Sequence, residues 1–193
     1  MRFVTDSLHE HGTTGAGALR LRALLSSALA EAGRHAPGEA GRILGELLNA
    51  AEALLRQNRE QWRLEDVSHD PATGTAQLAR TKRMIDRSNA IRTAQINRID
   101  QLAHQLQPDR APSGDSPSLH LSETVGELTD RICILLLKQE YAADREARDF
   151  ASRKSRHLAR SLELTVTAMV RGRAALPPRG IMKFYGPAEE RPA

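Results

Sequence analysis

The sequence predicts an all-α protein, an antiparallel bundle of four to five long helices with an irregular C-terminal tail. Three observations favour this fold. Apolar residues recur at intervals of three and four over long stretches. No segment sustains the alternation of apolar and polar residues that half-buried strands show, and turns rich in glycine and proline separate the stretches. Long helices joined by short turns pack as antiparallel neighbours.

The composition is typical of one soluble domain. The chain has 193 residues, a length that is enough to bury a sizeable core. Of these residues 40% are hydrophobic and 27% are charged. Its single cysteine, Cys133, excludes an intramolecular disulfide, and we expect it to be a small core residue. No apolar run is long enough to span a membrane, and the N-terminus lacks a signal-peptide core. We therefore expect a cytoplasmic protein without membrane contact.

The elements follow in order along the chain. Residues 1–15 are predicted to form a flexible arm and residues 16–176 the helical bundle. The first helix is expected from about Ala16 to Ala32, with Gly33 ending it and Leu19 among its apolar residues. The second is expected from Pro37 to about Val67, followed by a turn at residues 70–74. The third covers about residues 76–106, and residues 107–119 form a polar loop.

The last helical region is expected from Ser122, read as an N-cap before acidic residues, to about Ala175. A bend is placed near residues 152–155. Gly172 and the prolines that follow it end the region, and residues 177–193 form the tail.

The segment Ser122–Lys138 departs from an ordinary amphipathic pattern, because residues 132–137 are apolar and follow directly on several charges. A helix that is apolar on all sides is normally buried. Glu123 and Asp130 would then enter or border the core, where charges must be paired or functional.

The third helix carries a comparable polar stripe. Six polar residues lie within an arc of about 80° beside its apolar side: Lys82, Asp86, Asn89, Thr93, Asn97 and Asp100. The stripe is either a solvated face or one wall of a polar network. In the second case the network comprises Glu65, Asp66, Lys82, Arg83, Asp86, Asn89, Arg92, Asp100, Glu123, Asp130, Arg131 and Lys138.

Four segments carry a recognisable set of motifs: Asn58–Asp66, Lys82–Asp100, Ser122–Lys138 and Lys183–Pro187. Together they resemble a bacterial family of domains of unknown function, number 4254, and the resemblance covers about residues 58–187. It implies an all-helical architecture and a shared set of motifs, with no settled reaction. It also implies a setting beside transferases of surface-glycan or natural-product assembly, including companion subunits of sulfotransferase-like enzymes in aziridine-antibiotic pathways.

Four positions depart from the family pattern. Arg63 stands in place of histidine, Thr93 in place of asparagine, Asn97 in place of an acid and Val125 in place of proline. Loss of a histidine and a carboxylate argues against a catalytic or metal site in this member.

Catalytic candidates are the carboxylates Glu65, Asp66, Asp86, Glu123 and Asp130. Helical bundles can hold metals with carboxylates and acid-x-x-His pairs, and Asp66-x-x-His69 has that spacing. A second such pair is missing, and Lys82, Arg83 and Arg131 on the same elements would neutralise the carboxylates that a metal needs. No metal and no cofactor are therefore predicted. Cys133 lacks an adjacent base.

An arginine-rich C-terminal third suggests either phosphate binding or a solvated helix face with acidic partners. We favour the solvated face, because no aromatic platform or nucleic-acid motif accompanies these residues: Arg145, Arg148, Arg153, Lys154, Arg156, Arg160, Arg171, Arg173 and Arg179.

The leading functional hypothesis is a non-catalytic partner subunit that binds and stabilises a transferase-type biosynthetic enzyme. Three observations support it: the incomplete set of catalytic residues, the setting that the family resemblance implies, and the leucine-rich helix faces at Leu24, Leu25, Leu47 and Leu48. A homo-oligomer is an alternative assembly. The rival hypotheses are an enzyme that uses the carboxylate cluster on a polar small molecule, with or without metal, and nucleic-acid binding through the arginine-rich helix.

Overall fold

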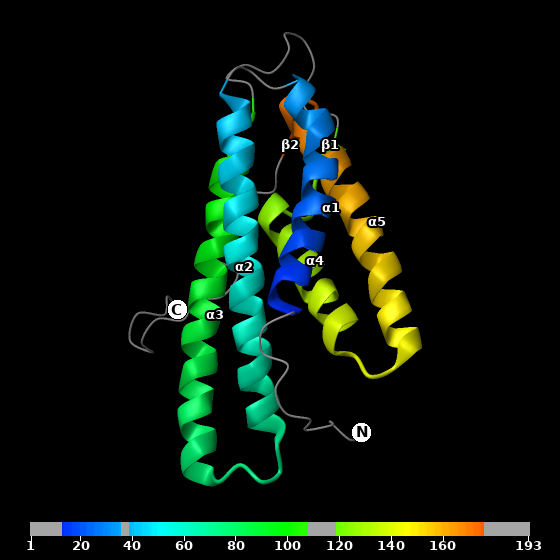
Figure 1. Cartoon of the computed structure of the whole chain (residues 1–193). Helices are drawn as coiled ribbons and strands as arrows, with labels where there is room; N and C mark the ends of the chain where they lie inside the picture. The colour runs from blue at the N-terminus through cyan, green and yellow to red at the C-terminus, as the bar shows by residue number, and fades with distance from the viewer. Residues whose placement is uncertain (1–12, 36–38, 108–118, 176–193) are drawn as a thin grey trace, which may run out of the picture.

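The computed structural model describes residues 13–35, 39–107 and 119–175. These residues form five helices: α1 (Thr13–His35), α2 (Ala40–His69), α3 (Thr75–His104), α4 (Val125–Tyr141) and α5 (Arg145–Val170). Successive helices run in opposite directions (Figure 1). The predicted all-α fold is confirmed. Residues 13–15 of the predicted arm belong to α1, whereas the rest of the arm and the tail 177–193 lie outside the described residues.

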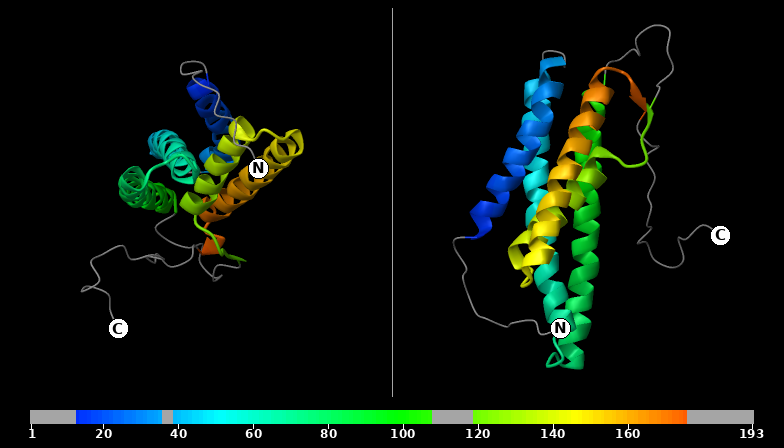
Figure 2. Two further views of the ribbon diagram at one scale, coloured as in Figure 1. Left: turned by 90° about the horizontal axis from the view of Figure 1, so that it is seen from below. Right: turned by 90° about the vertical axis from the view of Figure 1, so that its right-hand side faces the viewer.

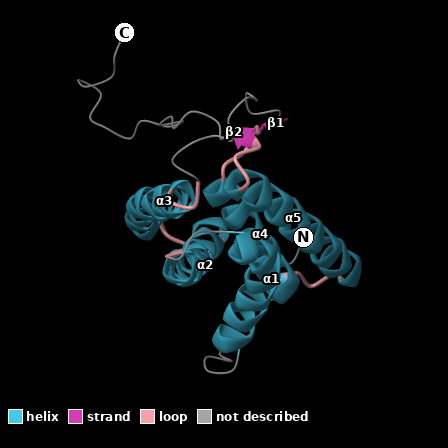
Figure 3. Cartoon of the chain, turned by 90° about the horizontal axis from the view of Figure 1, so that it is seen from above, coloured by secondary structure: helices cyan, strands magenta, loops and turns pink. Residues whose placement is uncertain are grey.

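Helix α4 is the central element, since it packs against each of the other four helices. Figure 3 shows it between the α2–α3 pair and α5. This position explains why its sequence is apolar on nearly all sides. Ile132 and Cys133 are fully buried within it, beside core leucines of α1 and α2. The predicted core position of Cys133 is therefore confirmed.

Helices α2 and α3 form a hairpin whose closed end extends beyond α1, α4 and α5 (Figures 1 and 2). No residue from 60 to 80 is buried. The turn lies where residues 70–74 predict it: the backbone N–H of Ala72 donates to the Asp70 carboxylate at 2.9 Å, and that of Thr73 donates to the Asp70 carbonyl at 3.0 Å. An aspartate that binds the backbone two residues on is a common turn former.

The last helical region differs from the prediction in two ways. Thr124, not Ser122, is the N-cap of α4, and it forms a capping box in which Glu127 N donates to Thr124 Oγ1 at 3.1 Å. The region is also two helices, because α4 ends at Tyr141 and Asp144 caps α5 by accepting from Glu146 N and Ala147 N. The residues where a bend was predicted, 152–155, lie inside α5.

Helix α5 ends at a Schellman motif. Gly172 N donates to Met169 O at 2.9 Å and Arg173 N donates to Ala168 O at 2.8 Å. Gly172 has a φ of 67°, the left-handed conformation that this motif requires and that glycine adopts without a steric cost. The predicted role of Gly172 is confirmed.

Smaller expectations are corrected. Helix α1 continues past Gly33 to His35, and Leu19 is 70% exposed, outside the core. Two short strands, β1 (Leu119–His120) and β2 (Ala174–Ala175), pair in parallel although no strand was expected. Two-residue strands are too short to produce an alternating pattern in the sequence.

None of the helices in the described ranges has the length and apolarity that crossing a membrane requires.

Candidate functional site

A cavity of about 360 Å³ lies between α2, α3 and α4. Residues of four successive turns of α2 form one wall, Ile134 and Leu137 of α4 form another, and Arg92 of α3 contributes to the lining. Its volume is at the lower end of the range of small-molecule sites, about 300–1,000 Å³. The cavity is therefore the main candidate for a binding site in the described part of the chain.

A buried carboxylate organises the polar part of this lining. Asp130 of α4 accepts two hydrogen bonds from the Arg92 guanidinium, with Arg92 Nε 2.8 Å from Asp130 Oδ1. Asn58 Nδ2 donates to the same Oδ1 at 3.0 Å. One carboxylate thus joins α2, α3 and α4, and its negative charge is balanced by a paired guanidinium, as a buried charge requires.

A second buried ion pair begins at the next residue of α2. Arg59 Nη2 donates to Glu140 Oε2 at 2.8 Å, and the two side chains are 6% and 14% exposed. Burial opposes the charge of Arg59, but the hydrogen bond and the charge of Glu140 outweigh it and raise the pKa of Arg59. Trp62 stacks on Tyr141 beside this pair, with ring centroids 5.7 Å apart. These contacts fix the wall of the cavity that Trp62 provides.

Two further carboxylates lie toward the exposed end of the cavity. Glu65 and Asp66 both line it, together with His69. Burial raises the pKa of Asp66, although the charge of His69 opposes this shift. His69 Nδ1 lies 2.7 Å from the Glu65 carbonyl oxygen, so the ring is bound to its own helix. The Glu65 carboxylate accepts from Ser68 Oγ at 3.4 Å.

Asp100 connects α3 to the start of α4. Its Oδ1 accepts from Gly126 N at 2.7 Å, and Gly126 N is one of the N–H groups that a helix leaves unpaired in its first turn. A Cβ at Gly126 would lie 2.5 Å from the Ile96 carbonyl oxygen. Glycine is therefore required here by the close approach of the two helices, which also brings Asp130 and Arg92 together.

The predicted polar network is only partly brought together. Arg92, Asp130 and Asp100 make contacts between helices, and Asn89 Oδ1 accepts from Gln61 Nε2 at 2.9 Å between α3 and α2. Glu123 and Arg131 pair with each other near the surface. Four other members are exposed: Lys82, Arg83, Asp86 and Lys138.

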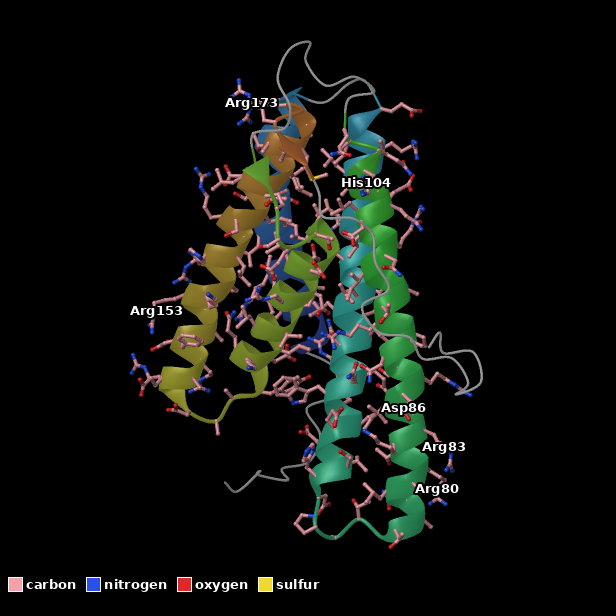
Figure 4. The ribbon with its side chains drawn as sticks, turned by 180° about the vertical axis from the view of Figure 1, so that it is seen from behind. Arg80, Arg83, Asp86, His104, Arg153 and Arg173 are labelled. Carbon is pink, nitrogen blue, oxygen red and sulfur yellow. The ribbon has the colours of Figure 1, made fainter. Side chains whose placement is uncertain are left out.

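Arg83 and Asp86 lie toward the closed end of the hairpin (Figure 4), whereas Arg92 and Asp100, farther along α3, contact α4. Figure 4 shows Arg80 and Arg83 pointing away from the bundle. The five catalytic candidates consequently occupy separate environments: Glu65 and Asp66 at the cavity, Asp86 in solvent, Glu123 in a surface pair and Asp130 in a buried pair.

Sequence reasoning missed Asn58, Arg59 and Glu140. Asn58 and Arg59 stand at the start of the motif Asn58–Asp66, so a signal was present. The acids Glu65 and Asp66, later in the same motif, are the stronger sign of a chemical site in the sequence. Glu140 offered no signal beyond its position at the end of the apolar segment.

Within the described residues, no three acidic, histidine or cysteine side chains lie together in a way that could hold a metal ion. Burial and the neighbouring charge of Asp130 raise the pKa of the Cys133 thiol. Such a thiol stays protonated and is a poor nucleophile.

The arginines of α5 lie mainly on its exposed face, and Figure 4 shows Arg153 pointing into solvent. Several have acidic or polar partners on the same helix: Arg145 lies 3.8 Å from Asp149, Arg160 pairs with Glu163, and Arg156 Nη1 donates to Ser152 Oγ at 2.7 Å. Arg179 lies outside the described residues.

Comparison with known proteins places these motifs in a family. The family described as a protein of unknown function, DUF4254, matches residues 48–169. This range contains the whole cavity lining, both buried ion pairs and the Asp100–Gly126 contact. No curated protein and no solved structure matches the chain. The match covers more than half of the sequence, so the chain belongs to the DUF4254 family.

Proposed function

We propose that this protein is a non-catalytic helical accessory protein that binds and stabilises a transferase-type biosynthetic enzyme, and that the outer face of α3 makes the contact. The observation that carries the proposal is this face. Met84 and Ile91 are 51% and 43% exposed and lie seven residues apart, on one side of the helix. Arg80, Arg83 and Arg87 are exposed around them.

The composition of this face fits a protein partner. Methionine and arginine are enriched in protein interfaces relative to other surfaces, and an arginine beside apolar side chains is a common source of binding energy. Among the described helices, α3 packs chiefly against α2 and α4, which leaves its outer face accessible. The closed end of the α2–α3 hairpin also extends beyond the other helices (Figure 2). Its charge is complementary to an acidic surface with apolar residues at its centre.

The leucine-rich faces named as a motive for this function do not serve it. Leu25 and Leu47 are fully buried, and Leu24 and Leu48 pack against the core. These leucines hold α1 and α2 within the bundle, so they do not provide a surface for a partner. The accessible apolar residues lie on α3 instead.

The predicted carboxylate cluster is dispersed, because only Glu65 and Asp66 of its five members line the cavity. The other three are not placed to act with them on one substrate. Asp130 is committed to Arg92 and Asn58, and Asp86 is in solvent.

Co-expression with the transferase-type enzyme encoded beside this protein tests the proposal. Size-exclusion chromatography with light scattering should show a complex, and also whether this protein alone is a monomer or a homo-oligomer. Combined Met84→Glu and Ile91→Glu substitutions should weaken the complex about tenfold or more, because they place acids opposite an acidic surface.

The matched control places the same acidic residues on α5. Phe150 and Leu164 are exposed to a similar extent, 58% and 55%, so Phe150→Glu with Leu164→Glu should leave the complex intact. Absence of a complex with the unaltered protein would refute the accessory role. Equal weakening by both pairs would refute the assignment to α3.

A further inference from the structure

The cavity between α2, α3 and α4 has a lining that selects for one kind of ligand. Its apolar part is formed by Trp62, Ile134 and Leu137. Its polar part has two zones, the Asp130-bound pair of Asn58 and Arg92 and, toward the exposed end, Glu65 and Asp66. The charge in each zone decides what the cavity can accept.

In the first zone, the charge is already balanced. The Arg92 guanidinium faces the Asp130 carboxylate through two hydrogen bonds, and Asn58 donates to that carboxylate as well. A ligand that competed for these groups would have to separate a buried ion pair, which costs more than an exposed pair.

In the second zone, acidic side chains outnumber basic ones. Glu65 Oε2 accepts from Ser68 Oγ at 3.4 Å, and the charge of His69 acts on Asp66, while His69 Nδ1 is bound to the backbone of its own helix. The lining therefore has an excess of negative charge beside an aromatic side chain. An anionic ligand would be repelled there, whereas a cation gains from both carboxylates.

We propose that this cavity binds a small organic cation, an ammonium group on an apolar body. The ammonium group lies at the outer end beside Glu65 and Asp66, and the apolar body lies against Trp62, Ile134 and Leu137. The positive charge of a bound cation would favour the carboxylate form of Asp66 and so offset the desolvation that raises its pKa. The site is separate from the outer face of α3, so it does not depend on the proposed partner.

The chain supplies its own reporter for this site, because Trp62 is its single tryptophan. Titration of the full-length protein with cyclohexylmethylammonium should produce a saturable change in tryptophan fluorescence. Cyclohexylmethanol and cyclohexanecarboxylate have similar apolar bodies without the positive charge, and should bind about tenfold more weakly or not at all.

Substitution of both acids tests their role directly. Glu65→Gln with Asp66→Asn should weaken ammonium binding roughly tenfold, while the far-ultraviolet circular dichroism stays unchanged because both side chains lie at the exposed end of the hairpin. Glu60→Gln is the matched control: Glu60 is an exposed acid on the same helix that does not line the cavity. It should leave the affinity unchanged.

Three results would overturn the proposal: no saturable response to the ammonium probe, equal affinity for the alcohol or the carboxylate, or unchanged affinity in the folded double variant.

Discussion

Arg92 and Asp130 join α3 to α4 through a two-point ion pair, in which Arg92 Nε donates to Asp130 Oδ1 at 2.8 Å and Nη2 donates to Oδ2. The Asp130 side chain is 8% exposed and that of Arg92 is 25% exposed. The two residues are 38 positions apart in the sequence and belong to different helices. Their ion pair therefore restrains how α3 and α4 pack against each other, and not the conformation of a single helix.

Replacing Asp130 with alanine should lower the free energy of unfolding by about 2–3 kcal/mol, because Arg92 and Asn58 both lose their acceptor in a site with little water. Urea denaturation followed by circular dichroism measures this. Glu123→Ala removes a partner of Arg131 in a pair that is 36% and 47% exposed. That control should change stability by less than about 0.5 kcal/mol. Equal losses in the two variants would contradict the burial of the Asp130 pair.

Gly126→Ala should destabilise the protein by about 2–3 kcal/mol, since the new Cβ would meet the Ile96 carbonyl oxygen at 2.5 Å and force α3 and α4 apart. Thermal or urea unfolding gives the change. Gly45→Ala in α2 is the matched control, because nothing lies within 4 Å of its added Cβ. It should stabilise the protein by about 0.5–1 kcal/mol through the higher helix propensity of alanine.

Much of the fold follows from local patterns. The leucines of α1 and α2 recur with helical spacing, and the Asp70–Gly74 turn interrupts the pattern where the chain reverses. The apolar run at residues 132–137 correctly predicts a helix with little solvent contact. These features depend on residues close in sequence, which a single chain displays directly.

The pairing of charges depends on a different kind of information. Asp130 and Arg92 were each predicted as polar network members, but their contact is set by how α3 and α4 are rotated and shifted against each other. Asp86 and Lys82 share a stripe with Asp100 on a simple helical projection, but they are exposed because they lie nearer the closed end of the hairpin, which extends beyond α4. In the sequence alone, Arg59 and Glu140 resemble surface residues. They are buried because the C-terminal end of α4 packs against α2.

The sequence at the start of α4 contains a more specific N-cap signal than the one on which the prediction of Ser122 depends. Ser122 precedes acidic residues and satisfies one rule for an N-cap, whereas Thr124 and Glu127 satisfy the more specific capping-box spacing. At the other end, Asp144 marks the start of α5 without any glycine or proline between Tyr141 and Arg145.

Thr124→Ala should reduce the free energy of unfolding by about 1 kcal/mol, because Glu127 N loses its acceptor and the reciprocal bond from Thr124 N to Glu127 Oε2, 2.7 Å long, loses its orientation. Ser122→Ala should change stability by no more than a few tenths of a kcal/mol. Chemical denaturation of the two variants distinguishes the observed cap from the predicted one, and a larger loss in the serine variant would contradict Thr124 as the cap.

The stability of the Asp100–Gly126 contact should depend on pH in a direction that its burial sets. Burial raises the pKa of Asp100 above its ordinary 3.8, and hydrogen bonds from Gly126 and Thr124 oppose this shift. Because the folded state then binds a proton more tightly than the unfolded state, the contribution of Asp100 to stability is largest at low pH. That contribution falls as the pH rises from about 3.8 through the folded-state pKa, and is constant above it.

Asp100→Asn isolates this dependence, because the amide keeps an oxygen acceptor for Gly126 N but has no charge to desolvate. The stability of the unaltered protein relative to this variant should therefore decline with rising pH across that window. Asp100→Ala should be about 1–2 kcal/mol less stable than the asparagine variant at every pH, since Gly126 N then has no acceptor in a buried position. Urea unfolding at a series of pH values measures both differences. A relative stability that rises with pH would show that the helix N-terminus, and not burial, controls the charge of Asp100.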